Sequence, residues 1–238
     1  MSPTCEQVYL SLQERAVPAK AAHLQRYFNT SPGGYGEGDL FLGVTVPEQR
    51  KIAKTFASQI SLPELSELVQ HPYHEMRLTG LLALVYRFEK TSSEGDRQEL
   101  VDFYLAHLPW INNWDLVDSS CVQILGAFYW QKDKSLFYRL AASSQLWEQR
   151  IAIISSLYWI RKRVFTDALS LAKLLKNHPH DLMHKAVGWM LREVGKRNFD
   201  AAHKFLLVHY RTLPRTALRY AIERFPEELR QDFLKGRC

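Results

Sequence analysis

The feature that most constrains this fold is an internal repeat of helical segments. Expected helices begin near Arg77, Asp115, Arg150 and Lys185, and each follows a shorter amphipathic segment. The first step is 38 positions and the next two are 35 positions each. A two-helix period of this length is typical of α-solenoids of the HEAT or armadillo type, in which equivalent helices stack side by side. We therefore predict an all-α chain of HEAT-like two-helix repeats, forming a single domain over residues 1–238.

The local pattern also favours helices over strands. Apolar residues recur three and four positions apart, as in Ile151, Ile154, Leu157 and Tyr158. Residues that commonly start helices occur at many of the expected boundaries: Pro18, Pro47, Pro63, Thr166, Asn198 and Pro214. The glycine-rich segment 31–39 has no strand before it, so we interpret it as a loop between helices and not as a phosphate cradle.

The charge is distributed unevenly along the chain. Residues 1–138 contain 12 Lys and Arg against 16 Asp and Glu, whereas residues 139–238 contain 19 against 9. A basic half of this size favours a polyanionic partner, because Lys and Arg gain affinity by displacing counterions from phosphates. We therefore predict that the concave face of the solenoid is basic and binds DNA. The alternative is a basic surface that is only solvated.

Several classes of protein are disfavoured. No apolar run approaches the roughly 18 to 20 residues of a membrane span, and the N-terminal residues do not resemble a secretory signal. Three cysteines without C-x-x-C spacing indicate reduced thiols in a cytoplasmic protein. The histidine-containing segments 71–74 and 178–180 are more typical of helix-connecting loops than of metal sites. No nucleotide, metal or nucleophile signature is present, so we expect no cofactor and no metal.

Four residues with distinctive chemistry lie at similar points of the repeat: Trp114, Asp118, Arg150 and Trp189. Stacked repeats would bring them onto one surface. Indole faces attract positive charge, and a guanidinium suits a bidentate phosphate contact. The combination favours a cationic ligand that contains sugar and phosphate, as damaged DNA does. Other roles stay open: core packing for the tryptophans, a helix-terminal carboxylate for Asp118, and for Arg150 an ion pair with Asp115 or Asp118.

Four short strings carry a resemblance to a known family: Phe41-Leu42-Gly43-Val44 with Pro47, Trp114-Asp115-Leu116-Val117-Asp118, Trp147-Glu148-Gln149-Arg150, and Gly188-Trp189-Met190-Leu191-Arg192-Glu193. In order and spacing they resemble the AlkD-type DNA alkylation repair glycosylases, from about residue 21 to about residue 224. The resemblance implies a HEAT-like solenoid that cradles duplex DNA and removes N3- and N7-alkylated purines such as 3-methyladenine and 7-methylguanine. It also implies catalysis without a pocket for an extruded base. No purine-reading group of Asn, Gln and aromatic residues clusters locally in this sequence.

The family's functional Trp, Asp, Arg and Trp fall on Trp114, Asp118, Arg150 and Trp189. An alkylated purine is cationic and departs as a neutral base, so the remaining barrier is an oxocarbenium-like sugar that a carboxylate stabilises. Asp118 is the predicted carboxylate, whereas Asp115 is better placed to cap the helix. No lysine stands out as a nucleophile, which favours a monofunctional hydrolase. Further predicted DNA-contacting residues are Arg192, Lys185, Arg77, Tyr27, Arg215 and Arg219.

The chain departs from the family pattern at Asn113, where the family commonly has a tryptophan. We expect this asparagine either to loosen the helix start or to weaken contact with the lesion. The predicted partner is duplex DNA containing alkylated purines, bound by a monomer. Two other functions stay open: a non-catalytic protein that binds DNA structures, and a HEAT-type module that binds other proteins.

Overall fold

The computed structural model describes residues 1–238 as fourteen α-helices with no β-strand, which confirms the all-α, solenoid-like prediction. The chain separates into two compact units, residues 1–124 and residues 125–238. The single-domain boundaries therefore stay a prediction. None of the helices combines the length and the apolar character that a bilayer crossing requires.

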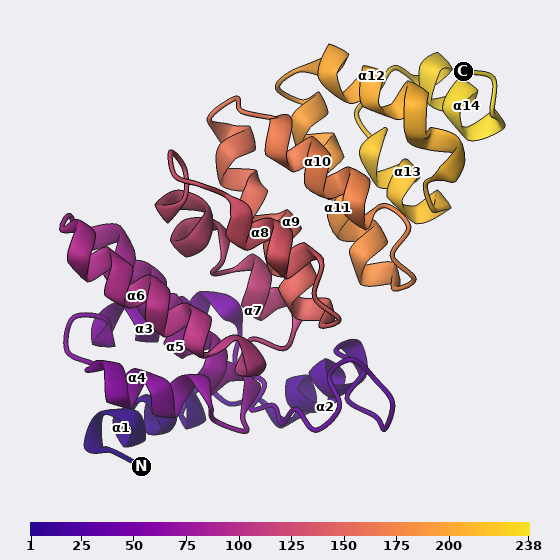
Figure 1. Ribbon diagram of the computed structural model, residues 1–238. Helices are drawn as coiled ribbons and strands as arrows, with labels where there is room; N and C mark the ends of the chain where they lie inside the picture. The colour runs from indigo at the N-terminus through magenta and orange to yellow at the C-terminus, as the bar shows by residue number, and fades with distance from the viewer. The chain divides into compact units, whose positions relative to one another are not determined.

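The first unit is built around one long buried helix (Figure 1). Helix α5 packs against α3, α4 and α7, and α1 covers α3 and α4. Nearly every residue of α5 from its start to Val85 is buried, so it forms the centre of the core. The helices of this unit are α1 (Pro3–Gln13), α2 (Pro18–Tyr27), α3 (Val46–Phe56), α4 (Leu62–Val69), α5 (His74–Lys90), α6 (Glu94–Ala106), the 3₁₀ turn η1 (Leu108–Trp110) and α7 (Trp114–Asp118).

Local sequence signals explain most helix starts in this unit. Pro18 occupies the first position of α2, as predicted, whereas Pro47 and Pro63 each lie one position later in α3 and α4. The start of α4 carries a capping box, in which Ser61 accepts from the Glu64 amide and the Glu64 carboxylate accepts from the Ser61 amide. The glycine-rich segment 31–39 is a loop between α2 and α3, as predicted.

The second unit is a stack of helix pairs (Figure 1). Helix α9 packs against α11, and α11 packs against α13, so the second helices of successive pairs lie side by side as in a solenoid. The helices are α8 (Ser135–Ala141), α9 (Leu146–Arg161), α10 (Thr166–Leu175), α11 (Asp181–Gly195), α12 (Phe199–His209), the 3₁₀ turn η3 (Tyr210–Thr212), α13 (Arg215–Ala221) and α14 (Glu227–Lys235). A π-helical turn, η2 (Val122–Gly126), lies at the boundary between the units.

Capping and core residues of the second unit follow the sequence analysis closely. Asn198 caps α12 by accepting from the Ala201 amide, and His180 caps α11 by accepting from the Leu182 amide. The histidine segment near residue 180 is therefore a helix-connecting loop. Trp159 is fully buried in the core, and its indole N–H donates to the Gly126 carbonyl. Pro214, predicted as a first helical position, instead precedes α13 as its N-cap.

One glycine sets how closely two helices of this stack approach. A Cβ added at Gly188 in α11 would lie 2.5 Å from the Ala217 carbonyl oxygen and 2.5 Å from the Tyr220 Cβ. Both atoms belong to α13, and neither is the end of a flexible side chain. We therefore expect Gly188→Ala to destabilise the protein by about 1–3 kcal/mol, although alanine in an ordinary helix interior stabilises by roughly 1 kcal/mol.

Urea unfolding followed by circular dichroism measures this difference. Gly195→Ala is the matched control on the same helix, because its added Cβ would approach neighbours no closer than 3.4 Å. The control should unfold at or above the urea concentration of the native protein. Equal midpoints for the two variants would contradict the close α11–α13 packing.

Candidate active site

The helix that carries Trp114 and Asp118 is short and firmly capped. Helix α7 begins at Trp114, so Trp114 and Asp118 lie four residues apart on one helical face. Asn113 is fully buried; its side-chain oxygen accepts from the Trp114 amide at 2.8 Å, and its amide nitrogen donates to Asp39 at 3.3 Å. The expectation that Asn113 loosens the helix start is wrong, because a buried cap holds the helix start in place. The alternative, a weaker contact with the lesion, stays a prediction.

Behind this helix start, a buried histidine lies between two carboxylates. The His74 imidazole donates through Nδ1 to Asp39 at 2.9 Å and through Nε2 to Asp115 at 2.8 Å. Asp115 also accepts from the Leu116 amide at 2.8 Å, so it caps the helix as predicted. Phe28 and Phe41 lie against the imidazole, with ring centroids 5.0 Å and 4.8 Å away. Loop 31–39, α5 and α7 are thereby joined at one point.

Electrostatics keep this histidine charged. Burial alone would lower the pKa of His74, but the charge and hydrogen bond of Asp115, with the hydrogen bond to Asp39, raise it to about 9. Burial alone would raise the pKa of Asp39; its hydrogen bond to His74 and the charge of Arg77 hold that pKa below its usual value. At neutral pH the cluster therefore contains an imidazolium and an ionised Asp39.

Arg77 belongs to this cluster and does not face solvent. It is 5% exposed, its Nη2 donates to Asp39 at 2.6 Å, and its Nη1 donates to the carbonyls of His71 and Pro72. The structure therefore argues against the predicted phosphate contact by Arg77. A buried guanidinium that neutralises Asp39 is unavailable to DNA.

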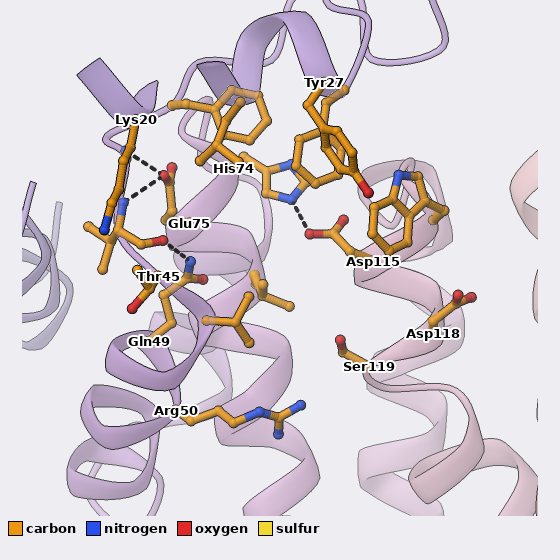
Figure 2. Close-up of a pocket in the computed structure, with 18 of the residues that line it drawn as sticks. Lys20, Tyr27, Thr45, Gln49, Arg50, His74, Glu75, Asp115, Asp118 and Ser119 are labelled. Atoms are coloured by element: carbon orange, nitrogen blue, oxygen red, sulfur yellow. Dashed lines mark hydrogen bonds and ion pairs between the residues drawn. The ribbon is translucent and has the colours of Figure 1, made fainter. Parts of the chain in front are cut away.

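A cavity of about 590 Å³ opens in front of the cluster, within the first unit. Figure 2 shows its walls: Thr45, Gln49 and Arg50 from α3 and its N-cap lie on one side, and Asp115, Asp118 and Ser119 on the other. The lining is mostly apolar and aromatic. Its residues are Lys20, His23, Leu24, Tyr27, Phe28, Phe41, Gly43, Val44, Thr45, Val46, Gln49, Arg50, His74, Glu75, Leu78, Trp114, Asp115, Asp118, Ser119 and Gln123.

Aromatic rings form one end of this cavity. Trp114 stacks on Phe28 with centroids 5.3 Å apart and planes 18° from parallel, and Tyr27 meets the Trp114 ring edge-on at 6.1 Å. Phe41 also stacks on Phe28, with centroids 5.2 Å apart and planes 17° from parallel. Tyr27 is 58% exposed, so its predicted contact with DNA is sterically open. Sequence reasoning missed Phe28 and the role of Phe41, because their contacts join different elements.

The string Phe41-Leu42-Gly43-Val44 forms the turn beside the cavity. Gly43 has φ +86°, and a Cβ there would lie 2.2 Å from the Val17 carbonyl oxygen, so only glycine fits. The buried Glu75 carboxylate accepts from the amides of Leu42, Gly43 and Val44. A side chain of α5 thus holds the turn that positions Phe41.

The remaining predicted residues lie in the second unit. Arg150 lies in the second turn of α9 and is 4% exposed, and its Nη1 donates to the Leu182 carbonyl at 2.6 Å. Its burial argues against the predicted phosphate contact, as it does for Arg77. Trp189 is half-buried on α11. Arg192 pairs with Glu223, Lys185 pairs with Asp181 at 2.8 Å, and Arg215 donates to the Leu234 carbonyl. Arg219 is exposed on α13. The convergence of Trp114 and Asp118 with Arg150 and Trp189 stays a prediction.

Fold and site together define an α-helical repeat protein with an aromatic-walled cavity in one unit and a basic helix stack in the other. The sequence model of a family described as DNA alkylation repair enzyme matches residues 8–225. The chain belongs to this family. A solved structure described as a predicted DNA alkylation repair enzyme from Enterococcus faecalis is similar, with a TM-score of 0.69 and 17% sequence identity. The alignment covers 90% of this chain and 98% of that chain. Comparison with curated proteins gave no significant match.

The His74 cluster predicts a specific pH dependence of stability. The pKa of His74 rises from its ordinary 6.5 to about 9 on folding, so its stabilising effect is complete below pH 6.5 and disappears as the pH rises through 9. At 1.36 kcal/mol per pKa unit the effect is about 3 kcal/mol. We expect His74→Gln to lose about this much stability at pH 6 and to show a flatter dependence between pH 6.5 and 9.

Urea unfolding of the native protein and the variant over pH 6–10 tests this expectation. His23→Gln, at an exposed position of α2, is the matched control and should follow the native pH profile. Parallel stability profiles for the native protein and His74→Gln would show that the imidazole is not held as a cation.

Proposed function

We propose that this protein is a monofunctional DNA glycosylase. It hydrolyses the N-glycosidic bond of cationic N3- and N7-alkylated purines, such as 3-methyladenine and 7-methylguanine, in duplex DNA. The observation that carries the proposal is the position of Asp118 and Trp114, one helical turn apart on α7, both lining the aromatic-walled cavity. Membership of the DNA alkylation repair family supports the same class of substrate.

The chemistry needs few protein groups. The alkylated base already carries positive charge, so it leaves with the electrons of the C1′–N bond as a neutral molecule. Positive charge then develops on the deoxyribose, and the Asp118 carboxylate stabilises it. Water adds to C1′ and gives up its proton to Asp118 or to solvent. The Trp114 indole face attracts the cationic base before the bond breaks.

The two units differ in net charge, and the difference fits a role for the first unit at the cationic base and for the second unit at the DNA phosphates. The first unit has 10 Lys and Arg against 15 Asp and Glu, and the second has 21 against 10. An acidic unit favours a cationic base, and a basic unit favours the phosphate backbone. In this proposal the second unit contributes phosphate contacts from Arg192, Lys185, Arg215 and Arg219.

The ion pairs seen for two of these residues are compatible with phosphate binding. Arg192 pairs with Glu223 and Lys185 with Asp181 near the surface, where such pairs contribute only about 0–1 kcal/mol. A DNA phosphate can therefore replace the carboxylate at little cost. The proposal is of a monomeric, cytoplasmic enzyme that acts on duplex DNA without metal or cofactor.

Removing the Asp118 charge should abolish most of the activity. We expect Asp118→Asn to release 7-methylguanine from a single-lesion duplex at least about 100-fold more slowly, because an amide does not stabilise the sugar cation. Single-turnover release of the free base, followed by chromatography, measures the rate. Asp102→Asn on the exposed face of α6 is the matched control and should retain native activity.

Two other results would favour a different function for this protein. Tight binding of the lesion duplex by the native protein, with no base released, would identify a non-catalytic protein that binds DNA structures. Absence of DNA affinity at low salt would favour a HEAT-type module that binds other proteins.

Charge on the base should also decide which lesions are excised. We expect 7-methylguanine to be released at least about 100-fold faster than neutral ethenoadenine, because only the cationic base departs without protonation. Both lesions are placed in the same duplex sequence and compared under single-turnover conditions. Similar rates for the two would show that the protein supplies a general acid, which this mechanism does not contain.

A further inference from the structure

A patch of positive charge lies in the second unit, where α9 and α11 end. Helices α9 and α11 pack against each other, and the Arg163 Nη1 donates to the Arg197 carbonyl at 3.3 Å, so the two ends are adjacent. The cations of these ends are all exposed except Arg197, which is half-buried. Together they form the helix-end patch: Arg161, Lys162, Arg163, Lys196 and Arg197.

One carboxylate neutralises only part of the helix-end patch. Glu193 pairs with Lys196 at 2.6 Å and with Arg197 at 2.8 Å. The other three members are paired with no carboxylate, and the Lys162 ammonium lies over the Tyr158 ring at 5.8 Å from its centroid. The attraction of such cations to the end of a helix is weak and is screened by salt. They are therefore available to an external anion.

The backbone at Arg163 is unusual for an arginine. Helix α9 ends in a Schellman motif, in which the Arg163 amide donates to the Ile160 carbonyl at 3.0 Å. The Val164 amide donates to the Trp159 carbonyl at 3.0 Å. The motif needs a left-handed residue after the C-cap, and Arg163 takes this position with φ +62°. Glycine adopts this conformation without the steric cost of a Cβ, so an arginine here lowers stability and indicates a functional contact for its side chain.

The hydrogen bond to the Arg197 carbonyl does not account for the arginine. Its donor and acceptor are 3.3 Å apart at an exposed position, where a hydrogen bond replaces one with water and contributes little. The bond uses one of the five N–H donors of the Arg163 guanidinium. The remaining donors suit a bidentate contact with a phosphate.

The helix-end patch also extends a row of side chains along α11. Lys185, Trp189, Arg192 and Lys196 follow one another at steps of four, three and four positions, so they share one helical face. Lys185 and Arg192 have phosphate contacts in the proposed function. Lys196 lies roughly 16 Å along the helix from Lys185, at 1.5 Å per residue. A groove of B-DNA is about 6 to 12 Å wide, so side chains at the two ends of α11 can reach the two strands of one duplex.

We propose that the helix-end patch binds the phosphate backbone of duplex DNA, whether or not the duplex contains a lesion. The inference rests on the proposed function for the duplex partner and deepens it, because it adds a contact that sets the affinity for undamaged DNA. Phosphate contacts position a protein on the duplex and carry no information about the bases. The helix-end patch therefore determines how tightly DNA is held and takes no part in breaking the glycosidic bond.

Replacement of Arg163 separates stability from binding. Arg163→Gly removes the charge and relieves the left-handed backbone, so we expect it to unfold at a urea concentration no lower than the native protein. It should bind an undamaged duplex at least about threefold more weakly, because one phosphate contact is lost. Arg163→Lys keeps a charge and should bind more tightly than Arg163→Gly. Fluorescence anisotropy of a labelled duplex measures binding. A lower unfolding midpoint for Arg163→Gly, or unchanged affinity, would contradict the assignment of Arg163.

The salt dependence of binding tests two other members of the helix-end patch. Each phosphate contact contributes about 0.9 to the slope of log affinity against log salt concentration, so Lys162→Gln/Lys196→Gln should reduce the slope by about 1.8. Lys173→Gln/Lys204→Gln is the matched control, with the same net charge and both changes at exposed positions of α10 and α12. The control should keep the native slope. Equal slopes for the two double variants would overturn the proposal.

Excision of 7-methylguanine separates this inference from the proposed function. In single-turnover reactions, the protein concentration that gives half-maximal release should rise in the variants by the same factor as their loss of affinity. DNA binding that depends on the helix-end patch, without base release by the native protein, would support the patch and remove the glycosylase proposal. Base release with DNA binding that the variants leave unchanged would remove the patch and retain the glycosylase.

Discussion

The ion-paired imidazolium of His74 is the interaction on which the rest of the first unit depends. It joins Asp39, at the end of a glycine-rich loop, to Asp115, at the start of α7. A buried cation between two carboxylates is stable only when the geometry is good and the remaining polar atoms are satisfied. Arg77, Asn113 and backbone amides complete those contacts. The position of α7, and with it that of Asp118, follows from this charge balance.

The residues that enclose the buried His74 also form part of the cavity at which we propose that the ligand binds. The rings that enclose the imidazolium, Phe28 and Phe41, are also cavity walls, and Phe28 supports the Trp114 indole. Aromatic faces attract cations, so one set of rings serves both the permanent cation and the cationic ligand that we propose. The acidic balance of this unit acts in the same direction, whereas the basic second unit suits phosphates.

Much of the architecture could be predicted from periodicity alone. The two-helix repeat, the helix starts near Arg77 and Asp115, and the helix start at Asn198 depend on local interactions within a few residues. The structure has all of them, with α5 beginning at His74 and α7 at Trp114. Arg77 was assigned to DNA because a basic residue near a helix start resembles a phosphate ligand. Its burial depends on Asp39, which is 38 positions away, and no local pattern reveals that pairing. Asn113 was misjudged for the same reason.

The sequence by itself determined the helical class, the repeat period, the uneven charge and the residues with suitable chemistry on α7. These properties follow from side-chain spacing and composition. Only the tertiary structure decided which charges are buried, that Asn113 is a cap, and that Gln49 shares a cavity with Trp114 and Asp118. The physical reason is that burial and pairing depend on contacts between segments far apart in the chain. In this fold those contacts are made through α5 and the loop that precedes α3.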